Sequence, residues 1–373
     1  QMTAQSWLVF QLTNSSFLLG LVGFFNTIPV FLFSLFAGVI ADRFNKKNIM
    51  ILTQFSFMIL AFILAILTSF GIINVKQLVI ISLLNGFVMA FDAPARQSMV
   101  VELVGKNHLL NAIALNSAAF NSARIIGPAL AGILVSVIGM AGCFYLNGIS
   151  FLAVIIALLS IKLNYNKSTQ LTQNNFWKDL LNGLNFIKNN KIIFTLVLMA
   201  GILSLFGVSY AILMPVFVKS IFSSGIKLLG VFMSAAGIGA LIGALSLAKL
   251  GDFKFKGKFL VVTVFVFSLS LVLFSFSKNL ILSLLYLTLI GWSSVASMSL
   301  INTLLQINVH DEYRGRVMSA FMLTFAGFIP FGNLLAGSLA QFFGASLAIS
   351  FGAIACFISF SILIISNKDI INL

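Results

Sequence analysis

Few side chains in this sequence could do chemistry, and the most unusual of them is an arginine inside an apolar run. Arg124 lies about fifteen residues beyond Leu109, where the run begins, which is about 22 Å along a helix. If the run crosses a membrane, the charge costs about 3 kcal/mol on insertion. Arg124 could bind an anionic or catecholate-like substrate, pair with a carboxylate inside the protein, or snorkel to the interface. Asn116, Asn121 and Asn26 are predicted to line the same path.

A second polar group combines Asp92 and Arg96, which stand four residues apart. That spacing places both side chains on one face of a helix, although Pro94 lies between them. Asp42 is predicted at the same depth, so we expect a charge network of Asp42, Asp92 and Arg96. The alternative is an ordinary surface ion pair, which contributes little to stability.

The composition shows what surrounds these side chains. Of 373 residues, 60% are hydrophobic and 8% are charged, whereas a soluble domain has about 25% charged residues. The mean hydropathy is +1.11. Unbroken apolar runs such as 52–70 and 259–276 favour membrane helices over the alternating strands of a β-barrel. The net charge of +14 comes from short basic clusters between these runs, so we do not expect nucleic-acid binding.

The apolar runs predict an all-α polytopic membrane protein with two pseudo-symmetric six-helix bundles, the first helix being truncated. Residues 1–162 form the first bundle, 163–191 a cytoplasmic linker with an amphipathic helix, and 192–373 the second bundle. Related halves of this kind place a substrate path between them. The partial first helix is predicted to end near Leu12. The predicted full helices span 17–41, 48–70, 77–96, 109–138, 142–162, 192–221, 226–250, 258–277, 280–305, 314–342 and 345–366.

Lysine and arginine concentrate in alternate loops, which predicts the orientation. The rich loops are 42–47, 96–108, 162–191, 249–258 and 314–316. Basic loops stay inside, so we expect a multi-pass protein of the cytoplasmic (inner) membrane with both termini in the cytoplasm. In the linker, Trp177, Leu180, Leu181, Leu184 and Ile187 recur at helical spacing. This pattern favours a helix lying on the membrane surface, the alternative being a lid packed on the bundles.

The segment from Gly38 to Lys47 resembles the loop between helices two and three that marks the major facilitator superfamily. It departs from that pattern at Asn45, where glycine is usual; asparagine also tolerates left-handed backbone, so we expect the turn to persist. The resemblance implies a latch between the bundles; plain anchoring by positive charge is the alternative. The latch residues are Gly38, Asp42, Arg43, Lys46, Lys47, Asp92 and Arg96.

Gly127, Pro128 and Gly132 resemble the antiporter motif of the superfamily's exporters, and they predict a kink in the fifth helix. Their alternative role is helix packing. The stretch 92–132 is similar to the branch that includes enterobactin exporters and macrolide efflux proteins. That resemblance implies a secondary active exporter of a small amphipathic, siderophore- or drug-like molecule, working by alternating access and proton antiport. An importer of the same fold and a non-transporting receptor or assembly factor are the alternatives.

No enzyme, cofactor or metal site is expected from this sequence. It contains no G-x-x-x-x-G-K-[ST] loop for ATP, and Cys143 and Cys356 both lie in apolar segments. We expect the proton gradient to supply energy, although no carboxylate lies deep in a complete predicted helix. The expected partners are the lipid bilayer and a small-molecule substrate, and the expected functional unit is a monomer.

Overall fold

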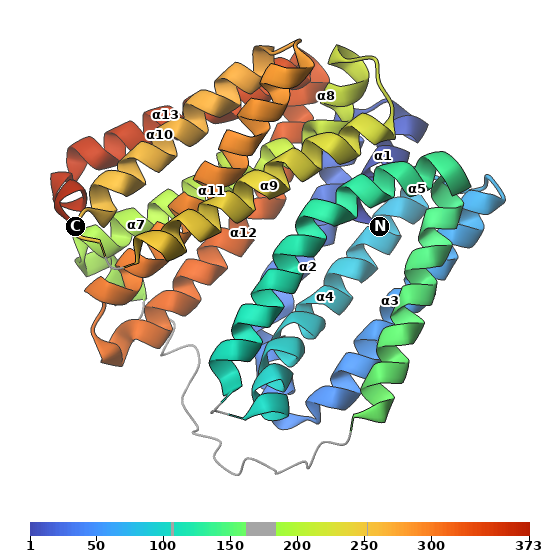
Figure 1. Ribbon diagram of the computed structural model, residues 1–373, viewed down its shortest axis with the longest axis horizontal. Coiled ribbons are helices and arrows are strands. Elements are labelled where there is room, and N and C mark those ends of the chain that lie inside the picture. The colour runs from blue at the N-terminus through green and yellow to red at the C-terminus, as the bar shows by residue number, and fades with distance from the viewer. Residues whose placement is uncertain (106–107, 162–183, 252) are drawn as a thin grey trace.

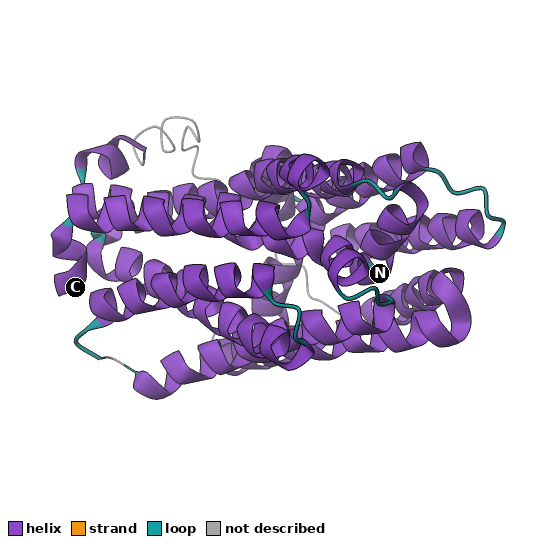
Figure 2. Ribbon diagram, turned by 90° about the horizontal axis from the view of Figure 1, so that it is seen from above, coloured by secondary structure: helices purple, strands orange, loops and turns teal. Residues whose placement is uncertain are grey.

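The computed structural model of the protein describes residues 1–105, 108–161, 184–251 and 253–373. Over these ranges the chain forms helices and no strand, arranged as two bundles side by side (Figures 1 and 2). The first bundle contains α1 (Met2–Thr13), α2 (Ser16–Arg43), α3 (Lys46–Ser69), α4 (Val75–Val104) and α5 (Leu109–Ser160). The second contains α7 (Lys191–Ile202), η2 (Leu203–Gly207), η3 (Val208–Leu213), α8 (Met214–Ile221), α9 (Ile226–Leu250), α10 (Lys256–Phe276), α11 (Leu280–Asn308), α12 (Asp311–Phe343), α13 (Ala345–Ser366) and η4 (Lys368–Asn372).

The predicted polytopic membrane fold is confirmed. Ten helical stretches of the described chain are long and apolar enough to cross a bilayer. One of them, 111–160, is 50 residues long and is interrupted at Gly139, whose φ of 75° and ψ of 174° are not helical. A glycine adopts positive φ without the steric cost that a Cβ would add. The stretch therefore holds two crossings, as the predicted boundaries 109–138 and 142–162 require.

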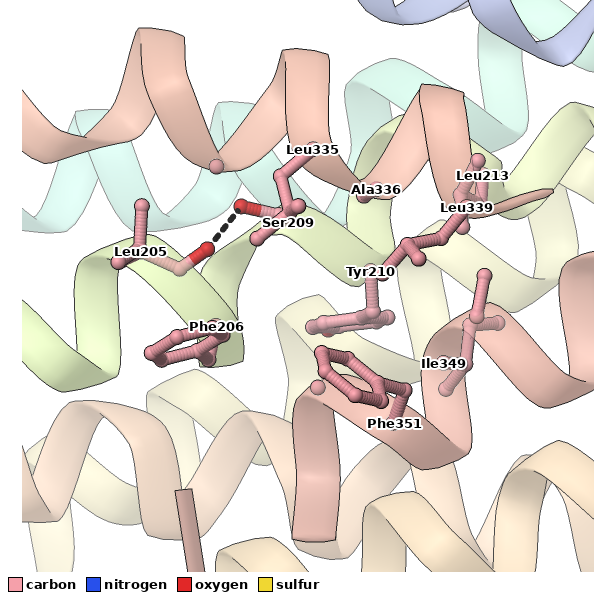
Figure 3. Close-up of a pocket in the computed structure, with 13 residues that line it drawn as sticks. Leu205, Phe206, Ser209, Tyr210, Leu213, Leu335, Ala336, Leu339, Ile349 and Phe351 are labelled. Carbon is pink, nitrogen blue, oxygen red and sulfur yellow. Dashed lines mark hydrogen bonds between the residues drawn. The ribbon is translucent and has the colours of Figure 1, made fainter. Parts of the chain in front are cut away.

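The predicted single helix 192–221 is instead broken near its middle. After α7 the chain forms a π-helical turn, η2, and then a 3-10 segment, η3. Pro215 contributes to the break because it has no N–H to bond to the carbonyl of residue 211. Ser209 Oγ donates to the Leu205 carbonyl at 2.9 Å. A small cavity lies beside this turn, and Tyr210 and Phe351 are among the residues that line it (Figure 3).

The last part of the linker packs on the second bundle. Residues 184–189 are helical, Ile187 is only 5% exposed, and the Phe186 ring stacks on Tyr313 of α12 with centroids 4.3 Å apart. Phe186 thus holds this part against α12, while Leu184 remains 45% exposed. The choice between a membrane-surface helix and a lid stays a prediction. Trp177, Leu180 and Leu181 lie outside the described residues.

The two bundles meet through α2 against α12 and α5 against α9. Their backbones approach closely: a Cβ on Gly20 would lie 2.5 Å from the Asn333 carbonyl oxygen, and one on Gly230 would lie 2.5 Å from that of Pro128. These contacts lie toward one end of the molecule, which we call the closed end. It carries the turns at 14–15 and 222–225, and Lys219 Nζ there donates to Asn14 Oδ1 at 2.7 Å.

Toward the other end, which we call the linker end because residues 161 and 184 lie there, the bundles splay apart (Figure 1). The side chains of α5 along this part are exposed almost without exception from 111 to 124; Leu115 is 72% and Phe120 is 69% exposed. The first crossing of α5, residues 109–138, contacts α9 around 124–132 and leaves most of its side chains exposed before that, so its first half lines the opening. The conformation is closed at one end and open at the linker end.

Candidate functional site

A cavity of about 360 Å³ lies between the bundles where α5 passes α9, and Arg124 lines it. Tyr210 from η3 and Met214 from α8 also line it, with Phe232 and Met233 from α9. Arg124 is exposed to this space, and its charge lies near enough to Tyr210 to interact with it. No ion pair or side-chain hydrogen bond among the described residues involves Arg124. The guanidinium group therefore has a cavity and no described carboxylate partner.

The backbone around Arg124 explains how α5 presents this side chain. Pro128 has no N–H, so the Arg124 carbonyl lacks its usual helical donor. Gly237 of α9 approaches that carbonyl, and a Cβ on Gly237 would lie 3.0 Å from the oxygen. Ser234 Oγ of α9 donates to the neighbouring Ile125 carbonyl at 2.6 Å. These contacts fix the turn of α5 that carries Arg124.

Gly127, Pro128 and Gly132, where a kink is predicted, keep helical backbone angles, and the non-helical residue within α5 is Gly139. The kink itself stays a prediction. Gly132 instead permits close packing, because its Cβ would lie 3.0 Å from the Ile226 carbonyl oxygen of α9. A Cβ on Gly127 would have no neighbour within 4 Å, since this residue faces the cavity.

The three predicted asparagines are not brought together with Arg124. Asn26 lines two smaller cavities, one within the first bundle and one between the bundles, and Met2 lines both of these and the cavity of Arg124. Asn121 folds back along its own helix and donates to the Ser117 carbonyl at 2.8 Å. Asn116 is exposed on the part of α5 that lines the opening at the linker end.

Sequence reasoning missed most of the polar lining. The available signal was the presence of uncharged polar side chains inside apolar helices. Each such side chain costs free energy in lipid unless it makes a hydrogen bond. The missed residues are Gln5, Tyr210, Asn85, Asn147 and Asn333.

Asp92 is the centre of a buried polar cluster within the first bundle. It is 5% exposed, and its Oδ1 accepts hydrogen bonds from Thr53 Oγ1 at 2.9 Å and Gln54 Nε2 at 2.7 Å. Its Oδ2 accepts from Arg96 Nη2 at 2.5 Å, because α4 continues through Pro94. Asp92 is therefore anchored between α3 and α4, while the Arg96 side chain that pairs with it is 54% exposed.

We expect Asp92→Ala to destabilise the protein by about 1–3 kcal/mol, because Gln54 would keep a buried donor without an acceptor, whereas Thr53 Oγ1 can still donate to the Met50 carbonyl. Thermal unfolding of the purified protein in detergent measures the effect. Glu102→Gln is the matched control, since Glu102 is exposed and pairs with Lys46. Equal unfolding temperatures for the two variants would show that Asp92 is not an anchor.

The loop with the family signature binds the ends of three helices of the first bundle. Asn45 caps α3: its Oδ1 accepts from the Lys47 N–H at 2.9 Å. Its φ of −63° is not left-handed, so the chain turns between α2 and α3 without the left-handed backbone that asparagine tolerates. Lys46 pairs with Glu102 near the end of α4, and Lys47 Nζ donates to the Ile161 carbonyl at 2.7 Å.

The latch between the bundles stays a prediction. A Cβ on Gly38 would meet nothing within 4 Å, because the bundles are apart at this end. The side chains of Asp42 and Arg43 lie outside what the structure describes. The described contacts of Lys46 and Lys47 stay within the first bundle.

Two helical bundles with a polar cavity between them, open at one end, define a membrane transporter of the major facilitator type. The family model described as "Transmembrane secretion effector" matches residues 1–370, and the chain belongs to this family. The family and the relatives below are transporters and not enzymes.

Curated relatives cover most of the chain. The chain is 28% identical over 343 residues to the staphyloferrin A transporter of Staphylococcus aureus, covering 91% of this chain and 85% of that protein. It is 24% identical to the multidrug efflux pump Tap of Mycolicibacterium fortuitum, covering 90% and 83%. It is also 24% identical to the enterobactin exporter EntS of Shigella boydii, covering 82% and 73%.

Solved structures confirm the fold. A point mutant of the nucleoside transporter NupG matches with a TM-score of 0.77 at 13% identity, covering 98% of this chain and 94% of that one. A bacterial homologue of the lysosomal transporter Spinster matches with a TM-score of 0.75 at 14% identity, covering 98% and 92%. At these identities the likeness concerns the fold alone.

Proposed function

We propose that this protein exports a small amphipathic anion, of siderophore or drug type, by alternating access. The observation that carries the proposal is Arg124, a cation in the cavity between the bundles with no described carboxylate beside it. An arginine held in this way offers a planar fork of donors to a carboxylate or another anion. The surrounding Tyr210, Met214 and Phe232 suit an apolar body attached to that anion.

Export is the favoured direction because two of the relatives are named for it, one as an enterobactin exporter and one as a multidrug efflux pump. Gly127 and Pro128 add support through their resemblance to the antiporter motif. The cavity is enclosed by the two bundles of a single chain, which supports a monomer as the functional unit.

We propose proton antiport as the energy source, supported by that same resemblance and by the lack of an ATP-binding loop in the sequence. Reconstituted vesicles with an imposed pH gradient test this directly. Substrate-dependent collapse of the gradient, read with a pH-sensitive dye, is the expected result. Transport that is unchanged when the gradient is removed by a protonophore would rule proton coupling out.

The experiment for export compares accumulation of staphyloferrin A and enterobactin in cells with and without the gene. Cells that carry the gene should retain less of at least one compound. Cells expressing Arg124→Ala to the same protein level are the control, and they should accumulate as much as cells without the gene. Equal accumulation in all three strains would contradict export of either compound.

We propose that the protein lies in the cytoplasmic membrane with the linker end and both termini inside, and the basic loops at that end support this orientation. We expect Asn45→Cys to be labelled by an impermeant maleimide only after the cells are opened. Ser224→Cys, in the turn 222–225 at the closed end, should be labelled on intact cells. Labelling of both residues from the same side would contradict the topology.

The latch proposal for Asp42 is tested separately. We expect Asp42→Asn to reduce the transport rate at least several-fold while the amount of folded protein stays normal. The reason is that Arg43, Lys46 and Lys47 alone would satisfy the positive-inside requirement, so an acidic residue among them needs another role. Normal transport by this variant would show that a latch through Asp42 is not needed.

A further inference from the structure

The loop that joins α9 to α10 carries a dense group of lysines and lies at the linker end (Figure 1). Residues 249–258 include four lysines. Three of them, Lys249, Lys254 and Lys258, are exposed, and none of the three forms an ion pair with another residue that the structure describes. We call these three side chains and the exposed ring of Phe255 the α9–α10 patch.

The corresponding loop of the first bundle directs its lysines toward the protein. Lys46 there pairs with Glu102, and Lys47 Nζ donates to a backbone carbonyl near the end of α5. In the α9–α10 patch, Lys258 Nζ instead lies over the Phe255 ring, 5.0 Å from its centroid. Positive-inside anchoring calls for lysines in both loops, but it does not explain why this second loop leaves them exposed without a partner.

The charge around the patch stays positive when its neighbours are counted. The loop has one acidic residue, Asp252, which lies outside the described residues, so its four lysines leave a net charge of +3 over 249–258. The first turn of α10 contains no acidic residue. The segment η4 packs against α10 and carries Lys368 and Asp369, whose charges cancel. An anionic partner therefore has the complementary charge.

The patch lies where the protein borders lipid. Helix α10 packs against α11 and α13 of its own bundle, and apolar side chains such as Val262 and Leu269 are exposed along it. The apolar run of α10 begins at Phe259, directly after Lys258, so the patch stands at the level of the lipid headgroups. The ring of Phe255 is 61% exposed at that level, where an aromatic side chain can enter the acyl boundary.

We propose that the α9–α10 patch binds an anionic phospholipid of the leaflet at the linker end, with its phosphate between Lys254 and Lys258. Each lysine beside an anionic leaflet strengthens the association about five-fold. The ring of Phe255 adds an apolar contact with the acyl chains, which a free phosphate ion cannot use. The patch therefore prefers phosphatidylglycerol to phosphatidylcholine, because the headgroup of phosphatidylcholine has no net charge.

A local crosslinking experiment tests this preference. The photoreactive residue p-benzoylphenylalanine replaces Leu250, which is exposed at the end of α9 beside the patch. The full chain is placed in nanodiscs that contain equal amounts of phosphatidylglycerol and phosphatidylcholine, and the crosslinked lipids are counted by mass spectrometry. The two lysines predict about 5- to 25-fold more crosslinked phosphatidylglycerol than phosphatidylcholine.

Paired variants show whether the patch is the cause. Lys254→Gln combined with Lys258→Gln should lower the lipid ratio at least five-fold. Lys76→Gln combined with Lys278→Gln is the matched control, because it removes the same charge from exposed lysines at the closed end, and it should leave the ratio unchanged. Salt at about 1 M should lower the ratio in the wild type, since it screens charges more than about 3 Å apart.

The inference is overturned if the wild type crosslinks both lipids equally, or if the ratio persists when both lysines of the patch are replaced. Excess inorganic phosphate is the last arm of the test. It should leave the ratio unchanged, because the ion lacks acyl chains. Loss of the crosslinked phosphatidylglycerol in phosphate, but not in chloride of equal ionic strength, would assign the patch to the free ion and reject the lipid.

Discussion

Replacing Arg124 with alanine is expected to lower the export rate at limiting substrate by about 10- to 100-fold, while the protein accumulates normally. The estimate follows from the loss of a charge-assisted hydrogen bond to an anion, worth about 1.5–3 kcal/mol. Initial efflux rates, measured over a range of internal substrate concentrations, give the change. The amount of protein in the membrane is measured beside them by immunoblot.

Arg124→Lys distinguishes a substrate contact from a structural role. Lysine keeps the charge and loses the planar fork, so a two-point contact with an anion should weaken while some transport remains. An internal ion pair would instead show itself as a loss of protein in the alanine variant. If Arg124→Ala accumulates and transports like the wild type, Arg124 is a bystander that extends toward the membrane interface.

Gly230→Ala is expected to shift the protein away from the conformation that is open at the linker end. The added Cβ would lie 2.5 Å from the Pro128 carbonyl oxygen, a backbone atom that cannot move unless α5 and α9 separate. Overpacking of this kind costs about 1–3 kcal/mol, which changes the ratio of two conformations by about 5- to 150-fold. Gly20→Ala should act in the same direction, through the Asn333 carbonyl.

The rate of maleimide labelling at Leu115→Cys measures this shift, because Leu115 is exposed in the opening at the linker end. Labelling should slow at least several-fold in the Gly230→Ala background. Gly127→Ala is the matched control on α5, since its Cβ meets nothing within 4 Å. Unchanged labelling in Gly230→Ala would mean that the α5–α9 contact does not hold the conformation.

The membrane fold was predictable because lipid requires long apolar helices, and run length alone located nearly every one. The break at Gly139 was predicted as well, because it falls between the predicted helices 109–138 and 142–162. The break between 203 and 213 could not be predicted from run length, because the apolar run continues through it and only the backbone hydrogen bonding changes. Pro215 was the available signal.

A site residue could be predicted where its own polarity is unusual for the apolar run that contains it. It could not be predicted where the site depends on contacts between residues of different helices. Arg124 was identified because a charge in an apolar run is costly. The partners of Asp92, by contrast, come from α3, and sequence spacing cannot show that Thr53 and Gln54 face α4. Asn121 looks like a cavity residue in sequence, yet its amide bonds within its own helix.

The charge of Arg124 has an electrical consequence. A membrane potential of 100 mV does about 2.3 kcal/mol of work on each elementary charge that crosses it. In the proposed export the guanidinium group remains with the protein, so an anion bound beside it would leave with its own charge uncompensated. When the cell interior is negative, that work favours outward movement of an anion and opposes inward movement. For the anionic substrate that we propose, the voltage itself is therefore a bias toward export.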